Sequence, residues 1–96
     1  MDILNEEIRD KLLEKMSREY ENIHKDRTDI EDLLKEKVEL KPRLWEEATG
    51  TVDQKKDYIR SRTSELDMKI HKLEADIEYS YNKIKVLEYY LVYCDE

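Results

Sequence analysis

The sequence is poor in residues that interrupt helices and in residues that cross-link chains. Glycine, proline and cysteine occur once each among 96 residues, and phenylalanine is absent. A disordered linker would be rich in glycine and proline, so their scarcity favours long helices. The lone Cys94 excludes an internal disulfide and a zinc site made of several cysteines, and it fits a reducing compartment.

Long apolar segments are also missing. The sequence has no apolar run of about 18 residues, the length that spans a membrane, and no signal-peptide pattern at its start. We therefore expect a soluble, cytoplasmic protein with no membrane partner.

Charge dominates the composition. Charged residues make up 45% of the chain and hydrophobic residues 39%, which leaves little material for a compact core and fits one domain at most. The 25 acidic and 18 basic residues give a net charge of -7. This acidic balance opposes binding to the phosphates of nucleic acids and anionic membranes, so we expect a protein partner.

Pro42 and Gly50 mark the main break in the helical pattern. Pro42 disfavours helix in the residue before it, and Gly50 can supply a left-handed helix stop. Thr51 with Gln54 fits a capping box at the start of a new helix. Two helices of similar length around one break predict an all-α fold, an antiparallel helical hairpin. We expect a single domain over residues 1–96, with a helix over 2–41, a turn over 42–51 and a helix over 52–94.

The second helix carries a heptad repeat. Its apolar residues alternate in steps of four and three, with isoleucine frequent in the a series and leucine in the d series. We expect an oligomerisation seam made of Ile59, Leu66, Ile70, Leu73, Ile77, Ile84, Leu87 and Leu91. Because β-branched residues at a and leucine at d favour a parallel two-stranded coiled coil, we predict a homodimer.

Charges beside this seam agree with a parallel dimer. Three pairs occupy position g and the following position e: Lys69 with Glu74, Arg62 with Asp67, and Lys83 with Glu88. These positions meet between parallel helices. The same alternation also arises by chance on a helix rich in lysine and glutamate.

The first helix has a less regular apolar stripe. One series of period seven consists of Leu13, Tyr20, Arg27 and Leu34, and the other of Met16, Ile23, Ile30 and Lys37. Neighbouring apolar residues widen this face enough to cover a second helix. In an antiparallel hairpin, Glu19 and Asp26 would face Arg62, Lys69 and Lys83. Two such hairpins would then dimerise into an elongated four-helix bundle.

Aromatic residues gather near the end of the second helix and in the turn. We assign a candidate partner surface to Trp45, Tyr79, Tyr89, Tyr90 and Tyr93. Tyrosine is enriched at interface hot spots, but aromatic rings at the ends of a hairpin also serve as packing. For the tyrosines we favour packing against the first helix and a second subunit. For Trp45 we favour packing at the loop end.

No residue pattern predicts catalysis. Glu21 and His24 have the E-x-x-H spacing of di-iron bundles, but both lie at positions that face water or the rim of the helix pair. The serines have no histidine and carboxylate at helical spacing to activate them. We expect no enzyme, no catalytic residue, no metal site and no cofactor.

Residues 45–91 combine Trp45, Gly50 and the segment YNKIKVLEY of residues 81–89. In these features the chain resembles short accessory proteins of bacteriophages and mobile elements of low-GC Gram-positive bacteria. The resemblance implies a small intracellular protein with an accessory role, located in the host cytoplasm if a phage encodes it.

We expect a non-enzymatic coiled-coil interaction protein, an accessory or inhibitor protein that binds a host or phage protein. The alternative is an acidic nucleic-acid mimic, a rod of carboxylates that blocks a host nucleic-acid-processing or defence enzyme. The lysine and arginine residues among the carboxylates weaken the negative electrostatic field that such a mimic needs. Direct nucleic-acid binding through the basic residues near the turn is the least favoured hypothesis, because that segment has no glycine-rich loop to hold a phosphate.

Overall fold

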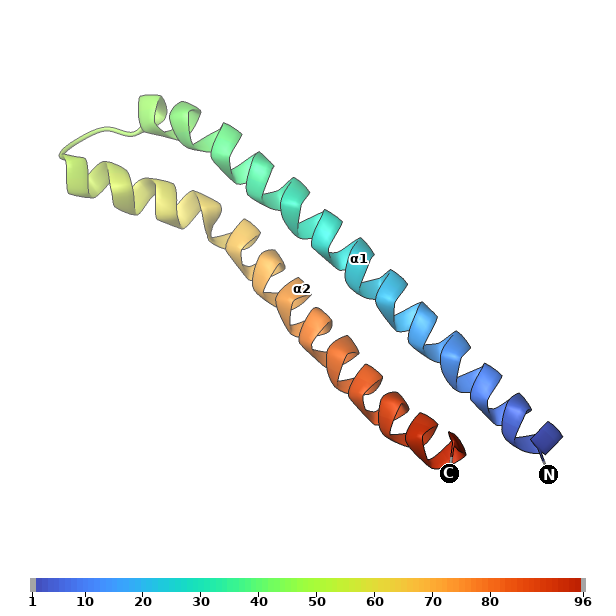
Figure 1. Cartoon of the computed structure of the whole chain (residues 1–96). Helices are drawn as coiled ribbons and strands as arrows, with labels where there is room; N and C mark the ends of the chain where they lie inside the picture. Colours follow the sequence, from blue (N-terminus) through green and yellow to red (C-terminus); the bar gives the residue numbers. More distant parts are fainter. Residues whose placement is uncertain (1, 96) are drawn as a thin grey trace.

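Two helices, α1 over Asp2–Glu47 and α2 over Val52–Asp95, account for nearly the whole chain. They come from a computed structural model that describes the backbone of residues 2–95 and the side chains of residues 5–93. The helices run side by side in opposite directions, so that both chain ends lie at the same end of the molecule (Figure 1). The molecule is a rod of 74 × 17 × 13 Å. The predicted all-α antiparallel hairpin is confirmed.

The first helix ends later than we expected, because it continues through Pro42 to Glu47. Pro42 has no N–H to donate to the carbonyl of Val38, but both residues are exposed, so water can satisfy that carbonyl. Leu44 and Ala48 are only 5% and 6% exposed, and the Ala48 N–H donates to the Leu44 carbonyl at 2.9 Å. Burial of these two side chains keeps the segment helical. The predicted turn over residues 42–51 is therefore wrong at its start.

The connection between the helices is short, and α2 begins at the residue that the sequence predicted. Gly50 has a φ of +102°, in the left-handed region that glycine adopts without strain. The Gln54 N–H donates to the Thr51 hydroxyl at 3.2 Å, and the Thr51 N–H donates to the Gln54 side-chain oxygen at 2.9 Å. This reciprocal capping box satisfies two amides at the start of α2, which begins at Val52 as predicted.

The heptad stripe of α2 faces α1 of the same chain. Leu66, Ile70 and Ile84 are buried, and the other five residues of the predicted seam are half-buried. Small polar residues, Thr63 and Ser80, are buried within the same stripe. The seam is thus filled by contact with α1 of the same chain.

The stripe that α1 turns toward α2 differs in part from the predicted one. Leu13, Tyr20 and Leu34 are 45–50% exposed, so this predicted series is wrong. The second predicted series holds, because Ile23 is buried and Met16, Ile30 and Lys37 are half-buried. Its companions toward α2 are the half-buried Leu12, Glu19, Asp26, Leu33 and Leu40. The contact stripe therefore lies one residue earlier than the series that we chose.

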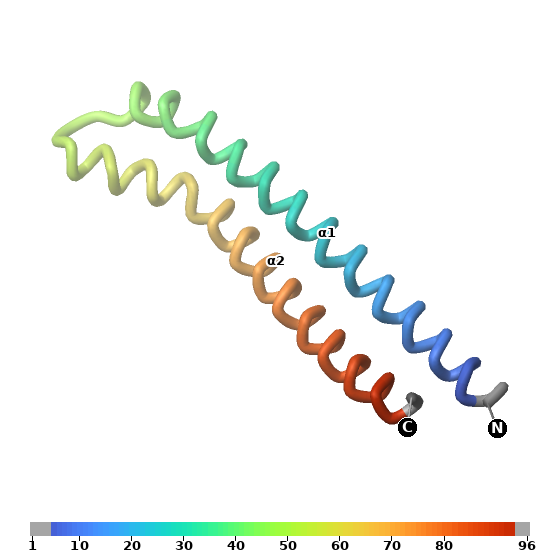
Figure 2. The backbone as a smooth tube through the Cα atoms, viewed as in Figure 1, coloured from blue at the N-terminus to red at the C-terminus, as the bar shows by residue number. Residues whose placement is uncertain are grey.

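A bend in α2 accompanies hydroxyl groups that bond back to the helix. Figure 2 shows α2 changing direction in the first half of its course, where yellow turns to orange. The Thr63 hydroxyl donates to the Ile59 carbonyl at 2.9 Å, and the Ser64 hydroxyl donates to the Ser61 carbonyl at 2.8 Å. Such bonds compete with the backbone ladder and bend helices. We attribute the bend to Thr63 and Ser64.

Replacing Gly50 by alanine should destabilise the hairpin by more than about 1 kcal/mol, because an L-residue is strained at positive φ. An added Cβ would also lie 2.0 Å from the Gln54 side-chain oxygen and disturb the capping box. Urea unfolding followed by circular dichroism at one protein concentration measures the change. Thr49→Ala in the same connection is the control. Equal midpoints for the two variants would contradict this account of the turn.

Candidate interaction surfaces

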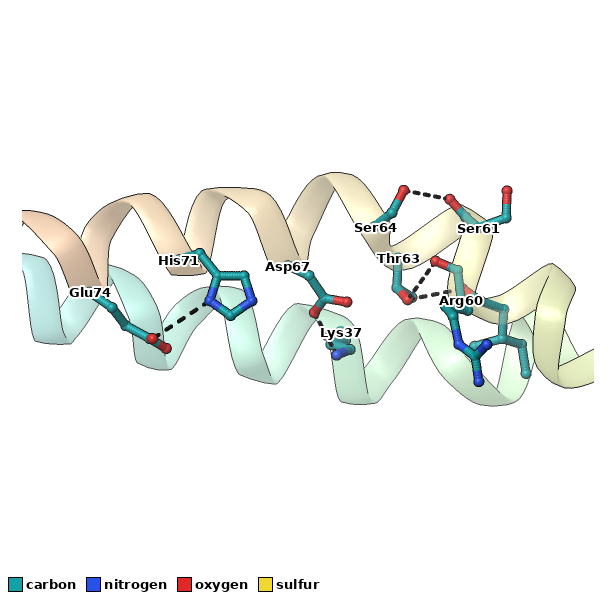
Figure 3. A network of polar contacts seen from close by, with 9 residues as sticks. Lys37, Arg60, Ser61, Thr63, Ser64, Asp67, His71 and Glu74 are labelled. Carbon is teal, nitrogen blue, oxygen red and sulfur yellow. Dashed lines mark hydrogen bonds and ion pairs between the residues drawn. The ribbon is translucent and has the colours of Figure 1, made fainter.

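Polar contacts between the helices fix the register of the hairpin. The Lys37 ammonium of α1 lies 2.6 Å from the Asp67 carboxylate of α2, and both side chains are partly buried (Figure 3). Glu19 pairs with Lys83 at 3.5 Å, as the predicted facing of these residues requires. Because the two ion pairs lie at different heights along the rod, together they oppose sliding of one helix past the other.

The tyrosines near the end of α2 form an exposed cluster. Tyr79, Tyr89, Tyr90 and Tyr93 are 52–63% exposed, so the expectation that α1 covers them is wrong. The Tyr89 hydroxyl donates to the Tyr93 hydroxyl at 3.0 Å, and the two rings meet edge to face with centroids 5.0 Å apart. This hydrogen bond raises the pKa of the Tyr89 hydroxyl. We call Tyr89, Tyr90 and Tyr93 the tyrosine cluster, because contacts join these three rings, whereas Tyr79 lies earlier on α2.

Trp45 lies near the turn, at the opposite end of the rod from the tyrosine cluster. Leu44 and Ala48 fill the loop end of the hairpin, whereas Trp45 is 38% exposed, so the predicted role of Trp45 as the loop plug is wrong. The Lys55 ammonium stands 5.0 Å from the centroid of its ring, a cation–π contact. The predicted partner surface is therefore divided between two ends of the molecule.

A groove with an apolar floor follows one side of the hairpin, and we did not predict it. Its first part lies between residues 15–19 and 79–87, and its second between residues 29–36 and 69–76. A third part continues along α1 from Glu36 to Arg43. The apolar residues that line it are Leu33, Leu40, Leu73, Tyr79, Val86 and Leu87. We call this surface the groove.

Carboxylates crowd together near the middle of the rod. Asp26 is half-buried in the helix pair. Burial raises the pKa of its carboxyl first, the charges of Asp76 and Asp29 raise it further, and Lys25 opposes them. The positive charge of Lys25 lowers the pKa of Asp26 by less than the other three causes raise it.

Residues with potential metal or catalytic chemistry are scattered. Glu21 and His24 are both exposed on α1. His71 pairs with Glu74 at 3.7 Å on the outside of α2 (Figure 3). Among the residues that the structure describes, no three His, Cys, Asp or Glu side chains come together as a metal site. The side chain of Cys94 lies outside the described residues.

Within the described part of the chain, neither helix has a segment long and apolar enough to cross a membrane. No family model, curated protein or solved structure matches this chain. Its function is therefore inferred from the surfaces themselves.

Replacing Asp26 by asparagine should stabilise the hairpin at neutral pH. Its pKa is raised in the folded state, so the ionised form costs stability above that pKa, and the cost disappears as the pH falls through it. The melting temperature of Asp26→Asn should exceed that of the parent chain at pH 7, and the two should converge near pH 3. Glu31→Gln, an exposed carboxylate on the same helix, serves as control. A gain that persists unchanged at low pH would contradict this cause.

Proposed function

We propose that this chain is a non-enzymatic helical interaction protein that forms a homodimer and binds another protein through the tyrosine cluster. The observation that carries the proposal is the exposure of the cluster, with all three rings more than half open to solvent at one end of the rod. Tyrosine contributes large contact area and a polar hydroxyl, and it is common among residues that dominate binding energy.

Further apolar side chains support the same proposal. Val86 and Val92 are 53% and 59% exposed on the part of α2 that carries the tyrosine cluster. Contiguous apolar surface on a small polar protein marks interaction sites more often than chance exposure. An accessory or inhibitor role toward a host or phage protein, as the sequence resemblance implies, is the biological form that we propose for this binding.

An acidic nucleic-acid mimic is the second candidate function. A row of carboxylates along α1, from Asp26 through Asp29, Asp32 and Glu36 to Glu39, favours it. Lys69 and Lys72 lie across the groove from part of this row and weaken its field. We therefore rank mimicry below protein binding through the tyrosine cluster.

The protein should be a dimer in solution, because a single hairpin leaves the groove and the tyrosine cluster open to water. Light scattering at micromolar concentration should give about twice the monomer mass of 11.7 kDa. A monomer mass that accompanies full helicity would contradict self-association.

Changing Tyr89, Tyr90 and Tyr93 together to serine should leave the hairpin folded and abolish binding of the partner. Because these rings are exposed, we expect each change to alter the free energy of unfolding by about 0.5 kcal/mol or less. Helicity, melting temperature and quantitative affinity capture from the source cells measure the two effects. Tyr20→Ser, a half-exposed tyrosine on α1, is the matched control.

The same capture separates the two candidate functions. Loss of the partner in the tyrosine variant but not in Tyr20→Ser supports recognition by the tyrosine cluster. Loss only after Asp29, Asp32 and Glu36 are changed to their amides, in a variant whose mass by light scattering equals that of the parent, supports mimicry. An identical set of captured proteins for the parent chain and the tyrosine variant would contradict the first proposal.

A further inference from the structure

The side of α1 along the groove reverses its charge near the middle of the helix. Steps of four and three place ten residues on one stripe of an α-helix. The half toward the N-terminus carries Lys11, Lys15, Arg18, Asn22 and Lys25, and the following half carries Asp29, Asp32, Glu36 and Glu39, with Arg43 at its end. Lys15 and Arg18 line the first part of the groove, and the four acidic residues line the others. One half of the stripe is thus basic and the other acidic.

We propose that a second copy of this chain docks along the groove in the opposite direction, with α1 of one copy against α1 of the other. The two-fold axis passes between Lys25 and Asp29. Lys15 then meets Glu39, Arg18 meets Glu36, and Lys25 meets Asp29, and symmetry forms each pair twice. This inference rests on the proposed self-association and specifies its surface and direction.

Charge complementarity selects this direction over a parallel one. If α1 lay parallel to α1 of the other copy, the basic half would face the basic half, and the acidic half would face the acidic half. Electrostatic complementarity suppresses such wrong arrangements because like charges in close contact repel. Lys11 and Arg43 would meet at the two ends of the antiparallel stripe, where both side chains are exposed and reach into water. The favourable pairs occupy the central part of α1 and, formed twice each, outnumber the like-charge contact that the axis places at Asp76 of α2.

The floor of the groove supplies the apolar surface that a stable contact needs. Leu33, Leu73 and Leu87 are half-buried in the hairpin, and Tyr79 and Val86 are more than half exposed. The hairpin register fixed by Glu19–Lys83 and Lys37–Asp67 sets residues 75–77 of α2 level with the proposed axis. Tyr79 would therefore lie beside Lys72 of the second copy. Within one copy, the Lys83 ammonium stands 4.5 Å from the Tyr79 ring centroid, a cation–π contact.

A second copy fits this surface better than a different partner. In a two-fold symmetric contact the same surface of each copy forms both sides of the interface. Such a surface has to be complementary in charge to itself when one copy is turned round, as this stripe is.

Cysteine cross-linking tests both the surface and the direction. Lys15→Cys and Glu39→Cys are each made in a chain that carries Cys94→Ser, and a bismaleimide of about 10 Å links nearby thiols. In the proposed dimer each cysteine lies about 36 Å from its own counterpart, at 1.5 Å rise per residue, but next to the other substituted position. Covalent dimers should therefore form in the mixture of the two variants and not in either variant alone. His24→Cys with Glu31→Cys, exposed residues outside the groove, should give no cross-link.

Three outcomes would overturn the proposal. Cross-linking of Lys15→Cys with itself would show a parallel dimer. A dimer mass with no cross-link in the mixture would place the contact on another face. A monomer mass would remove self-association altogether, yet binding through the tyrosine cluster would still be measurable, so this failure is distinct from failure of that part of the proposed function.

Charge reversal gives an independent check on the pairs. Lys15→Glu with Arg18→Glu should weaken the dimer at least about tenfold, and so should Glu36→Lys with Glu39→Lys, because each change opposes like charges twice. The fourfold variant restores opposite charges and should return within about threefold of the parent dissociation constant. Sedimentation measures the constants, and circular dichroism confirms equal helicity. Additive weakening in the fourfold variant would overturn the assigned pairs.

Discussion

The contact between the heptad stripe of α2 and a single facing stripe of α1 is the interaction on which the structure depends. Each helix has only one neighbour, so burial is confined to a narrow line and falls below 10% exposure at few apolar residues, among them Ile23, Ile70 and Ile84. Ion pairs beside this line fix the register, and the capping box at Thr51 fixes where α2 begins. All other faces of the rod remain open for contact with other molecules.

The sequence predicted the parts of the fold that depend on local or strictly periodic signals. The start of α2 follows from Thr51 and Gln54, and its contact stripe follows from an uninterrupted heptad. The phase of α1 did not follow, because adjacent leucines at 12–13 and 33–34 fit two registers equally well. Only the position of α2 decides between them. The end of α1 was misplaced because burial of Leu44 and Ala48 outweighs the lost hydrogen bond at Pro42.

The candidate surfaces were only partly predictable, since exposure depends on what the neighbouring helix reaches. The tyrosines were identified from composition, but a sequence does not show that α1 leaves Tyr79 and Tyr93 uncovered. The groove joins positions from both helices, and its charge reversal on α1 is visible only after the phase of that helix is known. The stripe one residue later, from Leu12 through Ile23 to Leu40, is mostly apolar and shows no such reversal. The groove can therefore be predicted only after the side of α1 that faces α2 is known.

The length of the rod has a consequence for valency. The tyrosine cluster lies at one extremity of a molecule 74 Å long. In a dimer whose copies run in opposite directions, the two identical clusters would lie at opposite extremities. Such a dimer would be a bivalent spacer. It would gain avidity only toward targets that present two sites at a matching separation, and it would bridge separate targets otherwise.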